Sequence, residues 1–200
     1  MSSVVISGDT SGTVTLTVPA TAGSNTITLP AVTGTAVISG QNSAITAGTA
    51  QASTSGTSID FTSIPSWVKR ITVMFNGVST SGTSNWQFQL GAGSVTSTGY
   101  TSYGSYMQNS GTPTVSANVT TGIVVYANNA SIIMYGATRF HNISGNTWVA
   151  EGTFSGTGAA STIFTTAGSI ALGGALDRVR ITTVNGTDTF DAGSINILYE

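Results

Sequence analysis

The amino-acid sequence predicts an all-β protein in which an extended N-terminal β segment precedes a jelly-roll-like β-sandwich. Helix is disfavoured, because Thr and Val crowd a helical turn while Ser and Gly loosen the helical backbone. Of the 200 residues, 25 are Gly. Short stretches that alternate apolar and polar residues recur at roughly 10- to 15-residue spacing, with Gly, Asn and Ser clusters between them. This spacing is typical of β-sandwiches and barrels.

A short repeat lies in the first predicted unit, residues 1–40. The run TLTVPATAG at residues 15–23 is followed by TITLPAVTG at residues 26–34. Each copy alternates apolar residues with Thr and then reaches a Pro, which cannot donate to a β-ladder and belongs at a strand end or edge. Because two isolated strands are only marginally stable in water, we expect assembly with other chains to bury the apolar positions of this attachment segment. These positions are Leu16, Val18, Ile27 and Leu29.

A linker and a compact domain are predicted to follow the repeat. Residues 41–57 are Ser, Thr, Ala, Gly, Gln and Asn around a single Ile, which predicts a flexible linker. Residues 58–200 are predicted to form the β-sandwich head domain, because about 140 residues bury roughly two-thirds of their unfolded surface. We expect the apolar last strand to be paired within a sheet or at a subunit contact. The strand candidates are Ile59–Phe61, Val68–Phe75, Trp86–Leu90, Gly122–Ala127, Ser131–His141, Thr147–Phe154, Ile170–Leu172, Val179–Val184 and Gly193–Tyr199.

The composition excludes several classes of protein. Charged residues make up 6% of the chain and the net charge is −2, which offers no long-range attraction for nucleic acid. Cys is absent, so no disulfide framework is expected. No run of about 18 apolar residues is present, so we expect no membrane insertion. The N-terminus lacks the basic and apolar regions of a secretory signal peptide, so we expect synthesis in a cytosol.

The residues that could support catalysis favour structural roles. His141 is the single histidine, whereas zinc sites usually draw on several His or Cys ligands. Asp188 and Asp191 lie close in sequence, but a glycosidase needs two carboxylates that face one bond across about 5–9 Å. Asp in such a stretch is more typical of turns, where its side chain caps backbone amides. We therefore predict a non-enzymatic protein with no metal and no cofactor.

The stretch GYTSYGSY at residues 99–106 has the composition of a recognition loop. It places Tyr100, Tyr103 and Tyr106 three residues apart among Ser and Gly. Rigid amphipathic rings supply contact area while small polar residues supply hydrogen bonds. The functional interpretation is that this loop, with Trp86 or Trp148, stacks on sugar rings. The alternative is that the tyrosines pack under a loop or line a subunit contact.

Two parts of the chain resemble proteins of tailed bacteriophages. Residues 6–16, ISGDTSGTVTL, with residues 25–34, NTITLPAVTG, resemble segments of fibre and virion structural proteins. Residues 59–77, IDFTSIPSWVKRITVMFNG, with residues 193–200, GSINILYE, resemble the C-terminal head domains of such fibres. The resemblance implies a homotrimer whose N-terminal segment attaches to the particle and whose β-sandwich head faces outward. It carries over no catalytic residue and no receptor-binding residue.

Three functions follow from these observations. The leading hypothesis is a non-enzymatic virion protein, a fibre that assembles in the bacterial host cytoplasm and whose head contacts a host-surface glycan. Its partners would be copies of itself and other virion proteins of the tail or capsid. The alternative is a capsid decoration or head-fibre protein, in which the head stabilises or ornaments the shell. A third hypothesis is a small glycan depolymerase that uses Asp188 and Asp191.

Overall fold

The structure is a computed structural model of the whole chain, and it describes residues 3–7, 13–17, 45–109, 111–116, 118–158 and 161–200. The chain divides into two compact units, Met1–Ala36 and Val37–Glu200. The described residues form strands, turns and bends without a helix, which confirms the predicted all-β class. Within this described part, no helix is long and apolar enough to cross a membrane.

The N-terminal unit contains a strand pair. Strands β1 (Ser3–Ser7) and β2 (Thr13–Thr17) run antiparallel, with Val4 opposite Leu16. β2 overlaps the first copy of the repeat, and it pairs with the segment that precedes the repeat. The burial of the attachment segment in an assembly stays a prediction. Three of its four positions lie outside the described residues: Val18, Ile27 and Leu29.

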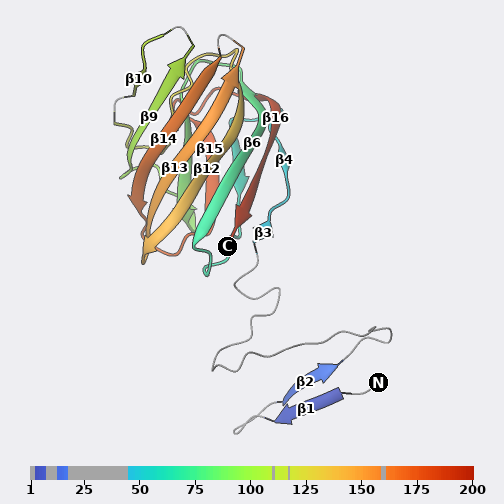
Figure 1. Cartoon of the computed structure of the whole chain (residues 1–200). Coiled ribbons are helices and arrows are strands. Elements are labelled where there is room, and N and C mark those ends of the chain that lie inside the picture. Colours follow the sequence, from blue (N-terminus) through green and yellow to red (C-terminus); the bar gives the residue numbers. More distant parts are fainter. Residues whose placement is uncertain (1–2, 8–12, 18–44, 110, 117, 159–160) are drawn as a thin grey trace. The chain divides into compact units, whose positions relative to one another are not determined.

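The second unit is a β-sandwich of two antiparallel sheets, and Figure 1 shows the larger sheet in front with β15 of the smaller sheet behind it. The larger sheet has nine strands in the order β10-β9-β14-β13-β12-β6-β16-β3, and β4 also pairs with β16. These strands are β3 (Thr46–Ala47), β4 (Gln51–Ala52), β6 (Arg70–Thr80), β9 (Thr101–Gln108), β10 (Thr114–Val115), β12 (Ile133–Ser144), β13 (Thr147–Thr157), β14 (Thr162–Ala171) and β16 (Phe190–Tyr199).

The smaller sheet has five strands in the order β11-β7-β15-β5, and β8 also pairs with β7. These strands are β5 (Ser58–Phe61), β7 (Trp86–Ala92), β8 (Ser94–Val95), β11 (Ile123–Val125) and β15 (Arg178–Thr183). The predicted last strand is paired within a sheet, as β16 lies between β6 and the short strands β3 and β4. The jelly-roll connection and the trimer stay predictions.

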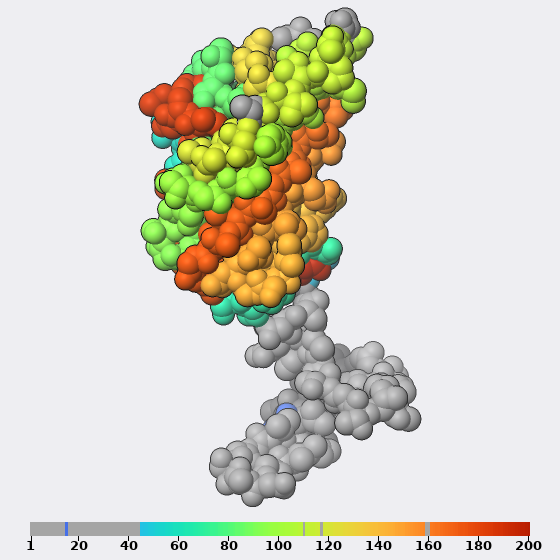
Figure 2. All heavy atoms as spheres, turned by 90° about the vertical axis from the view of Figure 1, so that its left-hand side faces the viewer, coloured from blue at the N-terminus to red at the C-terminus, as the bar shows by residue number. Residues whose placement is uncertain are grey.

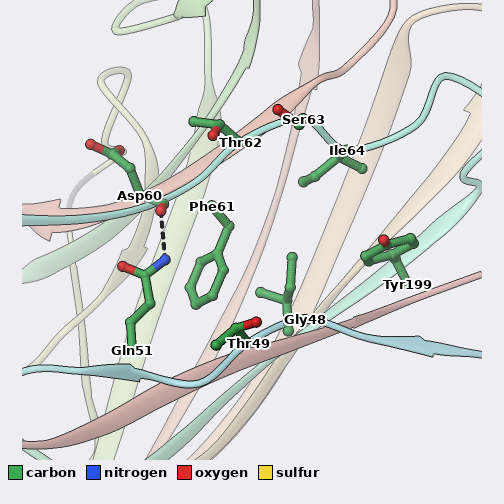
Figure 3. A pocket seen from close by; sticks show the side chains of 10 residues that line it. Gly48, Thr49, Gln51, Asp60, Phe61, Thr62, Ser63, Ile64 and Tyr199 are labelled. Atoms are coloured by element: carbon green, nitrogen blue, oxygen red, sulfur yellow. Dashed lines mark hydrogen bonds between the residues drawn. The ribbon is translucent and has the colours of Figure 1, made fainter.

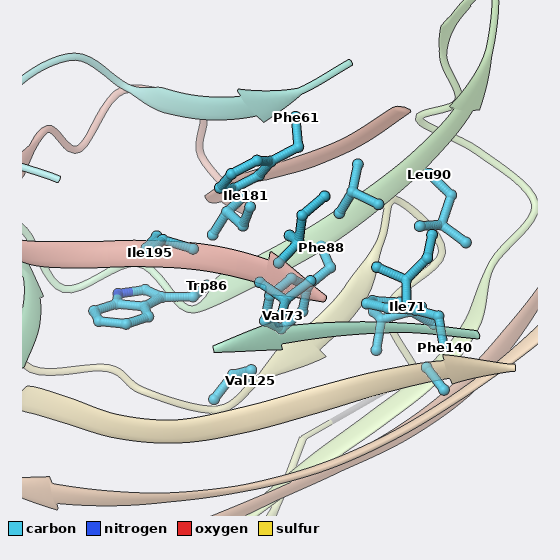
Figure 4. Close-up of a cluster of buried hydrophobic side chains, with 14 of the residues drawn as sticks. Phe61, Ile71, Val73, Trp86, Phe88, Leu90, Val125, Phe140, Ile181 and Ile195 are labelled. Carbon is cyan, nitrogen blue, oxygen red and sulfur yellow. The ribbon is translucent and has the colours of Figure 1, made fainter. Parts of the chain in front are cut away.

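Aromatic side chains from both sheets meet in the core (Figure 4). The ring centroid of Phe88 on β7 lies 5.6 Å from that of Phe75 on β6 and 5.7 Å from that of Phe140 on β12. Strands point successive side chains to opposite faces, and along β13 intermediate or exposed positions alternate with buried ones over the whole strand. The alternation visible in the sequence thus supplies an apolar inner face to each sheet, and Phe88 joins the two.

The predicted linker, residues 41–57, differs from the structure over its described part, residues 45–57. Its short strands β3 and β4 both pair with β16. Ser53, one residue after β4, is fully buried, and its hydroxyl donates to the main-chain oxygen of Ala192 at 2.8 Å. Small polar side chains suggested a linker, but pairing at a sheet edge depends on main-chain groups. The described part of this segment therefore belongs to the sandwich.

Strand β6 continues beyond its predicted end at Phe75, through Asn76 and Gly77. The register with β12 and with β16 shifts in this region, as it does at a β-bulge. Gly77 has a φ of +68° and Gly193 on β16 has a φ of +89°, and a Cβ on Gly193 would lie 2.3 Å from the Gly77 oxygen. Glycine adopts such a φ without steric cost, and its lack of a Cβ leaves room for this close approach. The Asn-Gly pair therefore forms a bulge in a long strand instead of a hairpin turn.

The sandwich has two distinct ends. At the near end, Tyr199 of β16 lies opposite Thr46 of β3, and the described part of the sandwich begins beside this point, at Ile45. At the far end, Phe190 of β16 lies opposite Thr80 of β6. The connections from β6 to β7 and from β15 to β16 therefore both lie at the far end.

Candidate functional site

Three of the five rings predicted to contact a glycan are buried. Trp86, Tyr100 and Trp148 expose 2%, 2% and 3% of their surface. The Trp86 Nε1 donates to the Thr80 Oγ1 at 3.0 Å. The Tyr100 hydroxyl accepts a hydrogen bond from the Leu90 main-chain nitrogen at 2.7 Å. A ring enclosed by the core cannot stack on a sugar. The prediction that these three residues contact a glycan is therefore wrong, and they are core residues.

The environment of Tyr100 also changes its acidity. Burial raises its pKa to about 12, because low-dielectric surroundings disfavour the charged phenolate. The hydrogen bond from Leu90 lowers this pKa and only partly offsets the effect of burial. The hydroxyl also lies 3.0 Å from the main-chain oxygen of Thr96. Tyr100 therefore serves as a neutral anchor between β7 and the loop that follows it.

The stretch predicted as a tyrosine-rich recognition loop is largely strand β9. Residues three apart on a strand point to opposite faces, so Tyr103 and Tyr106 cannot act on the same side. Tyr103 points outward and is 49% exposed. Tyr106 packs instead beside Phe164 and Tyr126, with ring centroids 6.3 Å and 5.5 Å away. Tyr103 is therefore the predicted ring that a ligand could reach most easily.

The outward side of the nine-stranded sheet, here called the broad face, carries scattered exposed apolar side chains. Met107 lies opposite Ile163 across β9 and β14, and they are 55% and 43% exposed. These two residues contribute to a shallow hollow of about 420 Å³. A second hollow of about 200 Å³ lies beside Tyr103 and Val115. Figure 2 views the molecule from the edge at which β9 lies. Both hollows are open and shallow.

The carboxylates weighed for catalysis hold the far-end turns together. Asp188 accepts hydrogen bonds from the Ser84 main-chain nitrogen at 2.9 Å and from the Asn185 Nδ2 at 2.7 Å. This confirms the predicted capping role of Asp188. Asp191 accepts a hydrogen bond from the hydroxyl of Ser79 on the neighbouring strand β6. Both carboxylates thus have structural partners.

His141 lies on the broad face, where its Nε2 is 3.9 Å from the Glu151 Oε1. Among the described residues, no group of three or more His, Asp or Glu side chains is arranged to hold a metal ion. The nearest acidic neighbour, Glu151, also contacts Arg139 at 3.3 Å. His141 is therefore part of an exposed charged cluster on the strand pair β12 and β13.

A small pocket, separate from the two hollows of the broad face, lies between the edges of the two sheets (Figure 3). It has a volume of about 250 Å³. Phe61 and Ile64 line its apolar part, and the Gln51 Nε2 closes one side by donating to the main-chain oxygen of Asp60 at 2.7 Å. Ser63 lines the same pocket with a φ of +61°, the left-handed region. The pocket is small, and a cross-sheet hydrogen bond spans it.

The outward side of the five-stranded sheet, here called the narrow face, carries a polar pocket of about 370 Å³. This volume lies in the range of small-molecule sites. Asn185 and Gly186 of the β15–β16 connection line it, which places it beside the far end. The side chains that line its floor come from β5, β7 and β15 and from the loop before β11. They include Ser58, Gln87, Gln89, Thr121, Arg180 and Thr182.

Two buried amides form part of the floor of this polar pocket. Gln87 and Gln89 expose 3% and 7% of their surface, although both lie on the outward side of β7. The Gln89 Nε2 donates to the main-chain oxygen of Thr121 at 2.9 Å. The Gln87 Oε1 accepts from the Thr121 hydroxyl at 2.8 Å. The loop before β11 thus covers the amides and fixes their orientation.

An ion pair orients the guanidinium at the pocket. The Arg180 Nε and Nη2 donate to the two carboxylate oxygens of Asp60 at 2.7 Å and 2.9 Å. This two-point geometry is the strong form of a charged hydrogen bond. The Asp60 carboxylate raises the pKa of Arg180 above its ordinary value. The side chains remain 37% and 36% exposed, so Arg180 is held in place while it still faces solvent.

Two features of the sequence relate to the polar pocket, and neither identifies it alone. Trp86–Leu90 alternates, and the two outward positions of this alternation are Gln87 and Gln89. Arg178 and Arg180 form one of the few basic clusters in a chain with 6% charged residues. The sequence could not show that β7, β15 and β5 are neighbours, and this neighbourhood brings Gln89, Arg180 and Asp60 into one row.

Comparison of the chain with protein-family models, with curated proteins and with solved structures finds no match in any of the three. A function for this chain is therefore inferred from the geometry of the described residues and from the phage-like sequence segments.

Proposed function

We propose that this chain is a non-enzymatic virion structural protein of a tailed bacteriophage, a fibre whose head contacts a glycan on the host surface. The observation that supports this most strongly is a difference between the two ends of the sandwich. Its described part begins at the near end, where β3 pairs with β16, whereas the polar pocket adjoins the far end. A recognition surface at the far end stays clear of the end at which the described part of the sandwich begins. We propose a tailed bacteriophage as the particle because of the phage-like sequence segments.

The proposal includes a homotrimer with other virion proteins as partners. Strands β1 and β2 form a two-stranded pair, which is marginally stable on its own in water. Pairing with further copies would bury the apolar edge positions of the attachment segment and cover its open strand edges. The head then needs no contribution from the attachment segment to stay folded, because its core lies within the sandwich.

Incorporation into particles tests the attachment segment. A Leu16→Asp, Ile27→Asp double variant is expected to be missing from purified virions, because charge at these positions opposes burial. The isolated variant should keep the thermal unfolding transition of the sandwich. The matched control is Thr15→Asp, since Thr15 is exposed, and this variant should be incorporated normally. A sandwich that unfolds in the double variant would contradict the division into attachment segment and head.

The position on the particle is a separate measurement. Electron cryo-microscopy of intact particles, with an antibody directed at the far end as a label, distinguishes a tail fibre from the alternative, a capsid decoration or head-fibre protein. Host-cell binding by the purified full chain tests the receptor role. A chain that is incorporated but never binds host cells would favour the capsid alternative.

A further inference from the structure

The polar pocket contains a hydrogen-bond acceptor that the protein leaves unused. Gln89 is more than nine-tenths buried, and its Nε2 is engaged by Thr121. Its Oε1 accepts no hydrogen bond from any residue in the described part of the chain, and Gln89 lines the pocket. Within the described part of the chain, the enclosed side-chain atoms that lack a partner are the Asn85 Oδ1 and the Thr138 Oγ1, so the Gln89 Oε1 is open to the pocket. This accessible oxygen is therefore suited to a donor group brought by a ligand.

The neighbouring strand β15 offers donors in a fixed direction on the same floor. Arg180 uses Nε and Nη2 on Asp60, and its Nη1 makes no hydrogen bond within the residues that the structure describes. Because Gln89 lies directly opposite Arg180 in the sheet, an acceptor and a donor stand side by side. A sugar hydroxyl can both donate and accept, so two neighbouring hydroxyls match this pair.

Three features of the pocket indicate the class of ligand. Asp60 neutralises Arg180, so the pocket offers no uncompensated positive charge that would favour a carboxylate or phosphate ligand. Its lining contains no aromatic ring, so recognition there relies on hydrogen bonds instead of ring stacking. Ser58 and Thr182 add hydroxyl groups from the neighbouring strands. These features favour a neutral ligand rich in hydroxyl groups.

We infer that the polar pocket is a binding site for a neutral saccharide, which it recognises through neighbouring hydroxyls held by the Gln89 Oε1 and the Arg180 guanidinium. Asp60 acts as a positioning residue that orients Arg180. This inference rests on the proposed receptor function and names its ligand class and its site. The pocket volume of about 370 Å³ suits one or two sugar rings.

Chemical-shift mapping on the full chain tests the site directly. The probes are mannose, galactose, glucose and, as an anionic comparison, N-acetylneuraminic acid. We expect at least one neutral sugar to bind with a dissociation constant of about 1 mM, typical for so small a ligand. The largest shifts should fall on the side-chain amide of Gln89 and on Arg180 and Thr182. Neutral sugars that shift none of these signals, or a preference for N-acetylneuraminic acid, would overturn the inference.

A matched pair of variants provides the second test. Arg180→Gln removes the donor in the pocket. Arg178→Gln, at the start of the same strand, breaks a similar two-point pair with the preceding residue, Asp177, and lies away from the pocket lining. We expect Arg180→Gln to weaken sugar binding at least tenfold and Arg178→Gln to leave it within twofold. Equal effects of the two variants would overturn the inference. The mapping on the unmodified chain keeps the test valid if Arg180→Gln fails to fold.

Host-cell binding separates this inference from the proposed function. If the unmodified full chain binds host cells and Arg180→Gln binds them equally well, the receptor role stands and the polar pocket is the wrong site. If the unmodified chain binds neither host cells nor sugars, the receptor role itself fails. Loss of cell binding in Arg180→Gln but not in Arg178→Gln supports both.

Discussion

The two outward faces of the sandwich share one core and differ in how they use their outward positions. The broad face carries apolar side chains that stand in solvent, such as Met107 at 55% exposed and Tyr103 at 49% exposed. The narrow face carries amides that are almost fully buried, Gln87 and Gln89. Single exposed apolar residues are ordinary on protein surfaces, whereas a buried polar group calls for an explanation.

The ion pair on the narrow face is also held in a more defined geometry than the ion pair on the broad face. On the broad face, Arg139 contacts Glu151 at 3.3 Å, with side chains 53% and 61% exposed. On the narrow face, Arg180 engages both carboxylate oxygens of Asp60. The first pair is a single solvated contact, and the second is a fixed fork. A fixed fork beside buried amides resembles a prepared site more closely than a scatter of exposed apolar groups does.

Both faces depend on the core, so the largest expected effect comes from breaking it. Phe88→Ala should lower the free energy of unfolding by about 3–5 kcal/mol, because it removes a buried ring and leaves a cavity between the sheets. Equilibrium denaturant unfolding of the full chain measures this. The control Phe88→Leu keeps most of the volume and should cost less than about 1.5 kcal/mol. If Phe88→Ala cost no more than Phe88→Leu, the central role of this ring would be refuted.

The next largest effect is a loss of stability at alkaline pH through Tyr100. Its folded pKa of about 12 lies above the ordinary value of 10.0, so the folded state keeps a proton that the unfolded state has lost. The stabilisation is complete below pH 10 and is lost as pH rises toward 12, by at most about 2–3 kcal/mol. Unfolding measured from pH 9 to pH 11.5 should show this decline.

Tyr100→Phe is the control for this titration. It removes the hydroxyl and its contacts with Leu90 and Thr96, so it should be less stable at pH 8 by about 1–2 kcal/mol. Its further loss between pH 9 and pH 11.5 should be smaller than that of the unmodified chain. Parallel declines in the two proteins would assign the alkaline loss to other groups.

The sequence predicted the strands well where buried and exposed positions alternate strictly. It predicted them poorly where main-chain pairing with a distant strand determines whether a segment is a strand. Trp86–Leu90 and Thr147–Phe154 were predicted as strands, and the structure has them within β7 and β13. β9 was missed because Tyr, Ser and Gly resemble a loop in composition. Its backbone nevertheless pairs along β14 from Thr101 to Gln108. Local composition carries no information about a partner strand that lies more than fifty residues away.

The candidate site was harder to predict than the fold, for a related reason. The prediction of glycan contacts was based on aromatic residues. Trp86 and Trp148 instead pack in the core, where large rings bury the most apolar area. The polar pocket depends on Asp60, Gln89 and Arg180 lying in one row, and their order in the sheet is not their order in the sequence. That Asp188 caps a main-chain amide could be predicted from the residue types around it, but its partner Ser84 could not, because Ser84 lies in a different connection far away in the sequence.

A smaller effect separates the two ion pairs. Double-mutant cycles with Arg180→Gln and Asp60→Asn should give a coupling of about 1 kcal/mol, because the fork makes two charged hydrogen bonds. The same cycle on the broad face, with Arg139→Gln and Glu151→Gln, should give about 0.3 kcal/mol or less. Thermal unfolding at low and high salt measures both, and salt should weaken the broad-face pair more in proportion. Equal couplings would remove the electrostatic difference between the faces.

The smallest expected effect concerns Tyr103, the exposed ring of the broad face. Tyr103→Ala should change the free energy of unfolding by less than about 0.5 kcal/mol, because the ring is half in solvent. Tyr106→Ala, on the opposite side of the same strand, should cost more than about 1.5 kcal/mol, since that ring packs beside Phe164. Neutral-sugar binding should be unchanged in Tyr103→Ala, because the polar pocket lies on the other sheet. If Tyr103→Ala kept full stability but lost sugar binding, the recognition surface would lie on the broad face and not on the narrow face.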